Sequence, residues 1–284
     1  MPEKRNLKFL MVKAHPHDFT HAAATMGIHI SQGDSVTLVV VTGGVAAHNE
    51  KLMDELRKPL EQQDPAIINQ SADDYAAEKE RELRAAAAIF GINDVRVLGY
   101  PMPFRVERYP AAVTQIKKII LEVRPDVIVS QSPFAQGPHG LCSGAFDDHQ
   151  EAAFATYEAE SYAGVPEPGS RVAPHRVAAT YYPGVYFQRD EYDFVVDITA
   201  WYDRRVKAEE MFKTQGHTPE YARRVVELIT GNIGWYSGLT YGEAFVRSRA
   251  DVVDKIQVPE FFLKRAHEPV VDQIKRYAGK KEKG

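Results

Sequence analysis

The stretch LKFLMVKAHPHDFTHAAATMGIHISQGDSVTLVVVTGG, residues 7–44, decides the fold. Its two runs of apolar and β-branched residues, at 7–14 and 35–44, have the composition of buried strands. The segment between them, residues 21–33, is rich in alanine and closes on a glycine, which is typical of a helix. A strand, a helix and a second strand in succession predict a βαβ unit, and hence a parallel sheet with a right-handed crossover.

The same alternation continues along the chain. We predict further strands at residues 94–100, 125–131, 175–183 and 194–199, and helices at residues 71–91, 111–123, 200–216 and 219–238. The pattern becomes irregular from about residue 240. No shift in composition marks a domain boundary, so the sequence indicates one domain over residues 1–284. The expected architecture is α/β, with a Rossmann-like, doubly wound and mostly parallel sheet that places ligands at the carboxyl ends of its strands.

Composition excludes several classes of protein. The chain has 35 basic and 39 acidic side chains, a net charge of −4, which provides no basic field for nucleic acid or an anionic membrane. No apolar run is long enough to cross a bilayer, and we expect the short one at 7–14 to be a strand rather than a signal peptide. Cys142 is the only cysteine, which rules out an internal disulfide and favours a cytoplasmic location.

Two groups of potential metal ligands follow predicted strands. The first group comes after the strand at 7–14 and the second after the strand at 125–131. Their members are His15, His17 and Asp18, and His139, Asp147, Asp148 and His149. Imidazole and carboxylate groups are good zinc ligands. A solvated loop or a helix cap would explain either group alone, whereas two groups at one edge of one sheet favour a metal site.

These two segments resemble the motifs of one family. VKAHPHDFTHAAATMG resembles the A-H-P-D-D-E signature of the PIG-L/LmbE family of zinc-dependent N-deacetylases, and FDDH resembles its later H-P-D-H motif. The resemblance extends, in order, over residues 7–247. It implies one zinc ion bound by His15, Asp18 and His149, with Asp148 orienting the site. A zinc ion bound in this way activates water and polarises a carbonyl, which is the chemistry of amide hydrolysis.

The sequence departs from the family pattern at three positions. His17 stands in place of the aspartate that serves as the general base, and we expect the imidazole to accept the proton instead. Phe19 replaces the glutamate of the first motif. Phe146 replaces the histidine that stabilises the tetrahedral intermediate, and it cannot donate a hydrogen bond. The metal ligands are therefore kept, while the deacetylase apparatus is altered.

The sequence is also similar to a different branch of the superfamily, 4-oxalomesaconate hydratase, a zinc enzyme that adds water across a carbon–carbon double bond. It shares the A-H-x-x-D-F pattern of that branch, which lacks the aspartate base, and Gln215 and His217 match a Q-x-H motif there. The acid/base glutamate that follows the second strand in this branch corresponds to His48, with Glu50 two residues further on. The resemblance therefore makes His48, Glu50 and His217 the alternative acid/base candidates.

Two more residues are candidates for substrate binding. His139 lies in a loop rich in glycine and proline and either lines the pocket or is solvated. Arg105 could bind a carboxylate or a phosphate, although a surface position is the default interpretation of an arginine. The favoured hypothesis is hydrolysis of an N-acyl group on a small polar substrate. The alternatives are hydration, or a related lyase reaction, of an unsaturated carboxylate, and metal binding without turnover. The resemblance is also compatible with a homo-oligomer.

Overall fold

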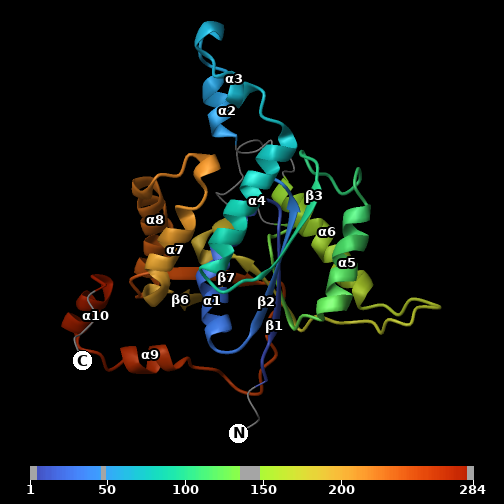
Figure 1. Cartoon of the computed structure of the whole chain (residues 1–284). Helices are drawn as coiled ribbons and strands as arrows, with labels where there is room; N and C mark the ends of the chain where they lie inside the picture. The colour runs from blue at the N-terminus through green and yellow to red at the C-terminus, as the bar shows by residue number, and fades with distance from the viewer. Residues whose placement is uncertain (1–4, 46–48, 135–147, 280–284) are drawn as a thin grey trace.

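The computed structural model describes residues 5–45, 49–134 and 148–279. Its centre is a seven-stranded sheet in the order β3-β2-β1-β4-β5-β7-β6 (Figure 1). The strands are β1 Lys8–Lys13, β2 Ser35–Thr42, β3 Asp94–Tyr100, β4 Val127–Ser130, β5 Ala179–Pro183, β6 Phe194–Asp197 and β7 Gly242–Arg247. Strands β3, β2, β1, β4 and β5 pair in parallel, whereas β7 pairs antiparallel with both β5 and β6. The predicted α/β fold with a mostly parallel sheet is confirmed.

Helices cover both faces of the sheet. They are α1 Ala23–Ser31, α2 Glu50–Glu55, α3 Pro65–Ile68, α4 Ala72–Ala88, α5 Ala111–Val123, α6 Asp148–Ala163, α7 Tyr202–Glu209, α8 Pro219–Ser237, α9 Glu260–Arg265 and α10 Val270–Tyr277. Successive side chains of a strand point to opposite faces. In β1, Phe9 and Met11 therefore pack with α1 and α4, while Leu10 and Val12 pack with α5 and α6. Figure 1 shows these two pairs of helices on opposite sides of the sheet. No described helix is long and apolar enough to cross a membrane.

The segment that follows β1 differs from the prediction. A 3-10 helix, η1 Pro16–Ala22, precedes α1, so helical structure begins before the predicted start at residue 21. The cause is local, because the Asp18 carboxylate accepts a hydrogen bond of 2.8 Å from the main-chain N–H of His15 and caps the turn. The residues after the first strand therefore form a capped turn at the carboxyl end of β1.

Two predictions in the second half of the chain also need correction. The helix expected at residues 200–216 ends as α7 at Glu209, where the His217 ring donates a hydrogen bond of 3.1 Å to the main-chain oxygen of Glu209. Beyond residue 240, where the sequence predicts irregular structure, the chain adds β7 to the sheet before α9 and α10. The helix predicted at 111–123, in contrast, coincides with α5.

Helix α8 lies close to the chain that leads into β7, and a glycine makes this approach possible. A Cβ atom at Gly234 would collide with the main-chain oxygen of Thr240. Gly231, in the same helix, has more space, because the nearest atom to a Cβ there would be a side-chain oxygen of Glu227 at 3.6 Å. The two glycines therefore offer a matched test of this contact.

We predict that Gly234→Ala lowers the free energy of unfolding by about 1–3 kcal/mol, because a backbone atom cannot move aside as a flexible side chain can. Gly231→Ala should raise it by up to about 1 kcal/mol, since alanine is the better helix former. Denaturant unfolding of both variants measures the two effects. Equal changes in the two variants would contradict the close approach of α8 to Thr240.

Candidate metal centre

The structure brings together three side chains that the sequence nominates as metal ligands. His15 precedes η1, Asp18 lies within it, and His149 lies in the first turn of α6. Asp18 Oδ2 is 3.4 Å from His15 Nδ1, and Asp18 Oδ1 is 3.4 Å from His149 Nε2. Two ligands of a tetrahedral zinc ion, each about 2.1 Å from the metal, lie about 3.4 Å apart. The spacing of this group therefore fits one divalent cation.

A second carboxylate orients the first ligand. His15 Nε2 lies 3.2 Å from Asp148 Oδ2, which leaves Nδ1 as the nitrogen that faces Asp18. Asp148 Oδ1 in turn accepts hydrogen bonds from the Phe104 main-chain N–H at 2.9 Å and from Arg105 Nη1 at 3.1 Å. Burial would lower the pKa of His15, but Asp18 and Asp148 hold it above its usual value. Asp148 thus occupies the place of a residue that orients a metal ligand.

Asp18 has a neutral partner that the sequence analysis missed. Gln131 Nε2 donates to Asp18 Oδ2 at 2.8 Å and to the Tyr186 hydroxyl at 2.9 Å, while Gln131 Oε1 accepts from the Ala14 N–H at 2.9 Å. Burial would raise the pKa of Asp18, but His149 and His15 hold it well below its usual range. Gln131 follows β4 directly, and this position after a strand is the signal that could have identified it.

We predict that Asp148→Asn weakens metal binding about 10- to 100-fold, because the amide loses the charge that holds His15 in its orientation. Competition with a chelator of known affinity measures the change, and the secondary structure should stay intact by circular dichroism. Glu158→Gln, an exposed change in the same helix, is the matched control and should leave the affinity unchanged. An unaltered affinity in Asp148→Asn would show that Asp148 does not support the ligand.

His17, Glu209 and His217 form a second group of side chains, and His17 lies in η1 beside Asp18. Glu209 Oε1 lies 2.6 Å from His17 Nε2 and 3.3 Å from His217 Nδ1, while Oε2 lies 2.5 Å from Arg205 Nη1. A separation of 2.6 Å is that of a hydrogen bond and is shorter than the roughly 3.4 Å between two zinc ligands. Burial would raise the pKa of Glu209, but His17 and Arg205 hold it well below its usual range. Glu209 is thus an ionised acceptor, and His17 Nε2 is the donor.

Glu50 and a buried lysine lie on the His217 side of the site. Glu50 begins α2 and acts electrostatically on Lys79, Tyr75 and His217. The Lys79 ammonium lies 5.3 Å from the centre of the Tyr75 ring, and the residue is only 2% exposed. Burial lowers the pKa of Lys79 to about 8, against the opposing effect of Glu50. Sequence analysis missed Lys79 because the pattern of α4 does not distinguish it from the exposed charges of that helix.

We predict that Lys79→Met stabilises the fold at neutral pH and that its advantage disappears in alkali. Between pH 8 and 10.5 the unfolded chain holds the proton that folded Lys79 has lost, so the wild type gains stability as the pH rises. Over this pH interval the free energy of unfolding of the wild type rises by about 3 kcal/mol at most relative to that of Lys79→Met. Denaturant unfolding from pH 7 to 10.5 measures the difference. The difference in free energy of unfolding between the wild type and the exposed control Lys118→Met should stay constant over this pH range. A constant difference between the wild type and Lys79→Met would contradict the burial of the Lys79 charge.

The structure describes some of the other predicted site residues but not all of them. Arg105 Nη1 donates to Asp148 and to the Phe104 carbonyl oxygen at 2.6 Å, so it supports the metal ligands, and its role in substrate binding stays a prediction. His48 and His139 lie outside the described residues, as does Phe146. The catalytic roles predicted for His17, Glu50 and His217 also stay predictions, although the structure places these side chains around one site.

Comparison with known proteins identifies the family. The model of the family described as "PIG-L: GlcNAc-PI de-N-acetylase" matches residues 10–160, more than half of the chain, and this segment contains all three metal-ligand candidates. The chain belongs to the PIG-L family. The resemblance that the two sequence motifs indicate is therefore confirmed.

Curated relatives of this PIG-L protein carry deacetylase names. The 1D-myo-inositol 2-acetamido-2-deoxy-alpha-D-glucopyranoside deacetylase of Streptomyces griseus is 29% identical over 193 residues, which are 62% of this chain and 54% of that protein. A protein of the same name from Geodermatophilus obscurus is 31% identical over 141 residues, 43% of this chain and 45% of that protein. The chain spans about half the length of the curated relatives it matches.

Solved structures show the same fold with two kinds of activity. The 4-carboxy-2-hydroxymuconate hydratase GalB from Pseudomonas putida has a TM-score of 0.69 at 20% identity and covers 88% of this chain and 100% of its own. The N,N'-diacetylchitobiose deacetylase from Pyrococcus horikoshii has a TM-score of 0.66 at 20% identity, and the match covers 87% of this chain and 85% of that protein. Likeness at this identity shows the fold alone and does not decide the reaction. A small-molecule substrate, a cytoplasmic location and a homo-oligomer stay predictions.

Proposed function

We propose that this PIG-L protein is a metal-dependent hydrolase that cleaves the amide bond of an N-acyl group on a small polar substrate. The observation that carries the proposal is the group His15, Asp18 and His149, whose spacing fits three ligands of one divalent cation. The deacetylase names of the curated relatives support an amide as the bond that is cleaved. A divalent cation such as zinc, when bound, supplies polarisation of the carbonyl and a water of lowered pKa.

His17 is the general base of the proposed reaction. Its Nε2 donates to Glu209, so the neutral ring accepts a proton at Nδ1. Nδ1 takes the proton of the attacking water and then returns it to the nitrogen of the leaving amine. The imidazole thereby does the work that the family pattern assigns to an aspartate in this position. His15 and Asp148 do not move protons in this scheme, since they hold and orient the metal site.

Hydration of an unsaturated carboxylate is the second candidate. The observation that favours it is the position of Glu50, which acts electrostatically on both His217 and Lys79. Burial lowers the pKa of His217, which favours a neutral imidazole, and the Glu209 carboxylate lies 3.3 Å from its Nδ1. Glu50 and His217 would then move the protons, and Lys79 would supply positive charge for the substrate carboxylate. Metal binding without either reaction is the third outcome.

We predict that the metal-loaded chain releases amine from N-acetylated amino sugars, and that His17→Ala lowers kcat about 100- to 10,000-fold because the proton acceptor is lost. The variant should still bind one equivalent of metal, which elemental analysis measures. His267→Ala changes an exposed histidine and should leave turnover unchanged.

Undiminished amide hydrolysis by His17→Ala would remove its role as the base. The second candidate would replace the first if the wild type hydrates an unsaturated dicarboxylate and hydrolyses no amide. In that case Glu50→Gln should abolish the hydration. A protein that binds metal and shows neither activity would overturn both enzyme proposals.

A further inference from the structure

We propose that Glu209 is the positioning residue of His17, and that Arg205 holds Glu209 so that the imidazole keeps its proton on Nε2 and presents Nδ1 as the acceptor. The inference rests on the proposed function, in which His17 is the general base. It goes further by assigning a role to two residues from α7 that no motif singles out. The pair would do for His17 what a buried carboxylate does for the histidine of a catalytic triad.

The two oxygens of Glu209 are divided between two partners. Glu209 is the last residue of α7 and is 1% exposed, and Arg205, one helical turn earlier, is 2% exposed. Oε2 accepts from the Arg205 guanidinium at 2.5 Å and Oε1 accepts from His17 Nε2 at 2.6 Å. Since an ionised carboxylate can only accept hydrogen bonds, the His17 nitrogen that faces it must carry the proton.

Neighbouring rings also pack against His17. Phe212 meets its ring edge to face, with centroids 4.9 Å apart, and His217 does the same at 5.3 Å. His21 lies at 6.0 Å in a third edge contact. His217 is itself fixed by its bond to the main-chain oxygen of Glu209. The orientation of the His17 ring is therefore determined by packing as well as by the hydrogen bond.

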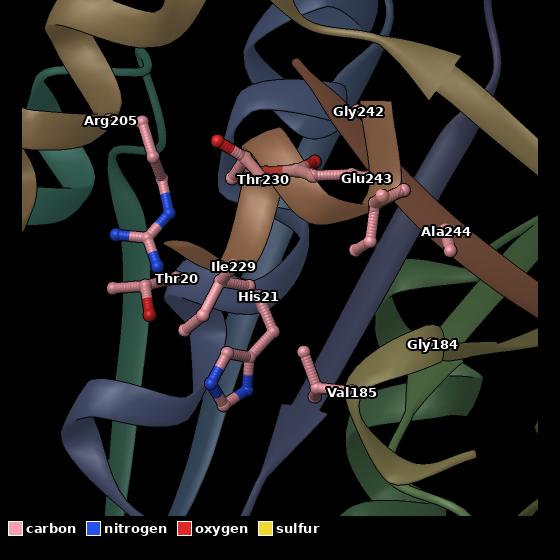
Figure 2. Close-up of a pocket in the computed structure, with 11 residues that line it drawn as sticks. Thr20, His21, Gly184, Val185, Arg205, Ile229, Thr230, Gly242, Glu243 and Ala244 are labelled. Carbon is pink, nitrogen blue, oxygen red and sulfur yellow. The ribbon is translucent and has the colours of Figure 1, made fainter. Parts of the chain in front are cut away.

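A second buried carboxyl group, that of Glu243, also interacts electrostatically with the guanidinium of Arg205. Figure 2 shows the Arg205 side chain extending from its helix toward Thr20. Arg205, Thr20 and Glu243 all line a small cavity of about 10 Å³. Burial raises the pKa of Glu243, and Thr25 and Arg205 act against the rise. Arg205 thus interacts with two buried carboxyl groups, Glu209 and Glu243, and both favour a charged guanidinium in this position. A fixed guanidinium in turn keeps Glu209 Oε2 occupied.

This arrangement makes Glu209→Gln an informative change. Arg205 offers only donors, so the amide oxygen of the new side chain must turn toward the guanidinium. Its NH₂ group then faces His17 and donates to Nε2. The imidazole proton moves to Nδ1, and the nitrogen that should accept a proton no longer can. In the double variant Arg205→Met with Glu209→Gln, the amide is free to turn its oxygen back to His17.

The experiment is ¹⁵N NMR of the histidine rings of the metal-loaded chain of 284 residues, with the His17 signals assigned by their loss in His17→Ala. We expect Glu209→Gln to move the His17 proton from Nε2 to Nδ1. It should lower kcat about 100- to 10,000-fold, with KM and metal content retained. The double variant should restore the Nε2 proton and recover at least about tenfold in kcat. Glu210→Gln, the neighbouring acid, is the matched control and should change neither.

The two proposals fail in different ways. An unchanged His17 tautomer in folded Glu209→Gln would overturn the positioning role, whatever the activity. A switched tautomer with undiminished turnover would support the positioning role and overturn His17 as the base. If Glu209→Gln does not fold, Glu209→Asp provides the test. It keeps the charge, so it should keep the proton on Nε2, and a proton on Nδ1 in that variant would overturn the inference.

Discussion

The site depends on the carboxylate of Asp18, because this group contacts three segments of the chain: its own turn after β1, the residue after β4 and the start of α6. Its oxygens face His15 of the same turn, His149 of α6 and Gln131 after β4. These segments can meet because β1 and β4 are parallel neighbours whose carboxyl ends share one edge of the sheet. Burying an ionised carboxylate is costly, and the partners around Asp18 offset that cost. A divalent cation would stabilise the same arrangement, so metal binding and folding favour one geometry.

An imidazole base at position 17 needs a hydrogen-bond partner that an aspartate base would not need. A carboxylate base accepts a proton at either oxygen, whereas an imidazole accepts at one nitrogen only while the other keeps its proton. Glu209 meets this need from 192 residues further along the chain. A replacement in the first motif and a buried acid–arginine pair in α7 are thus parts of one arrangement.

The antiparallel end of the sheet also contributes to the site. Glu243 of β7 accepts hydrogen bonds at the start of α1, from the Ala24 N–H at 3.2 Å and the Thr25 N–H at 2.8 Å. A carboxyl group at a helix N-terminus satisfies N–H groups that have no partner within the helix. This contact ties β7 to the helix that continues from η1, and hence to the turn that carries Asp18. The late strand therefore helps to hold the early motif in place.

Local patterns in the sequence determined the class of fold, most of its elements and the metal-ligand candidates. Strand and helix periodicity is a local property, as α5 illustrates, and His15 and Asp18 could be nominated because they directly follow a strand. Tertiary structure alone decided which side chains complete the site. Glu209 stands in a helix with other charged residues and looks solvent-exposed until the packing of α7 against η1 buries it. Lys79 is hidden in the same way, because burial and the choice of a partner depend on how distant elements pack and not on their neighbours in the chain.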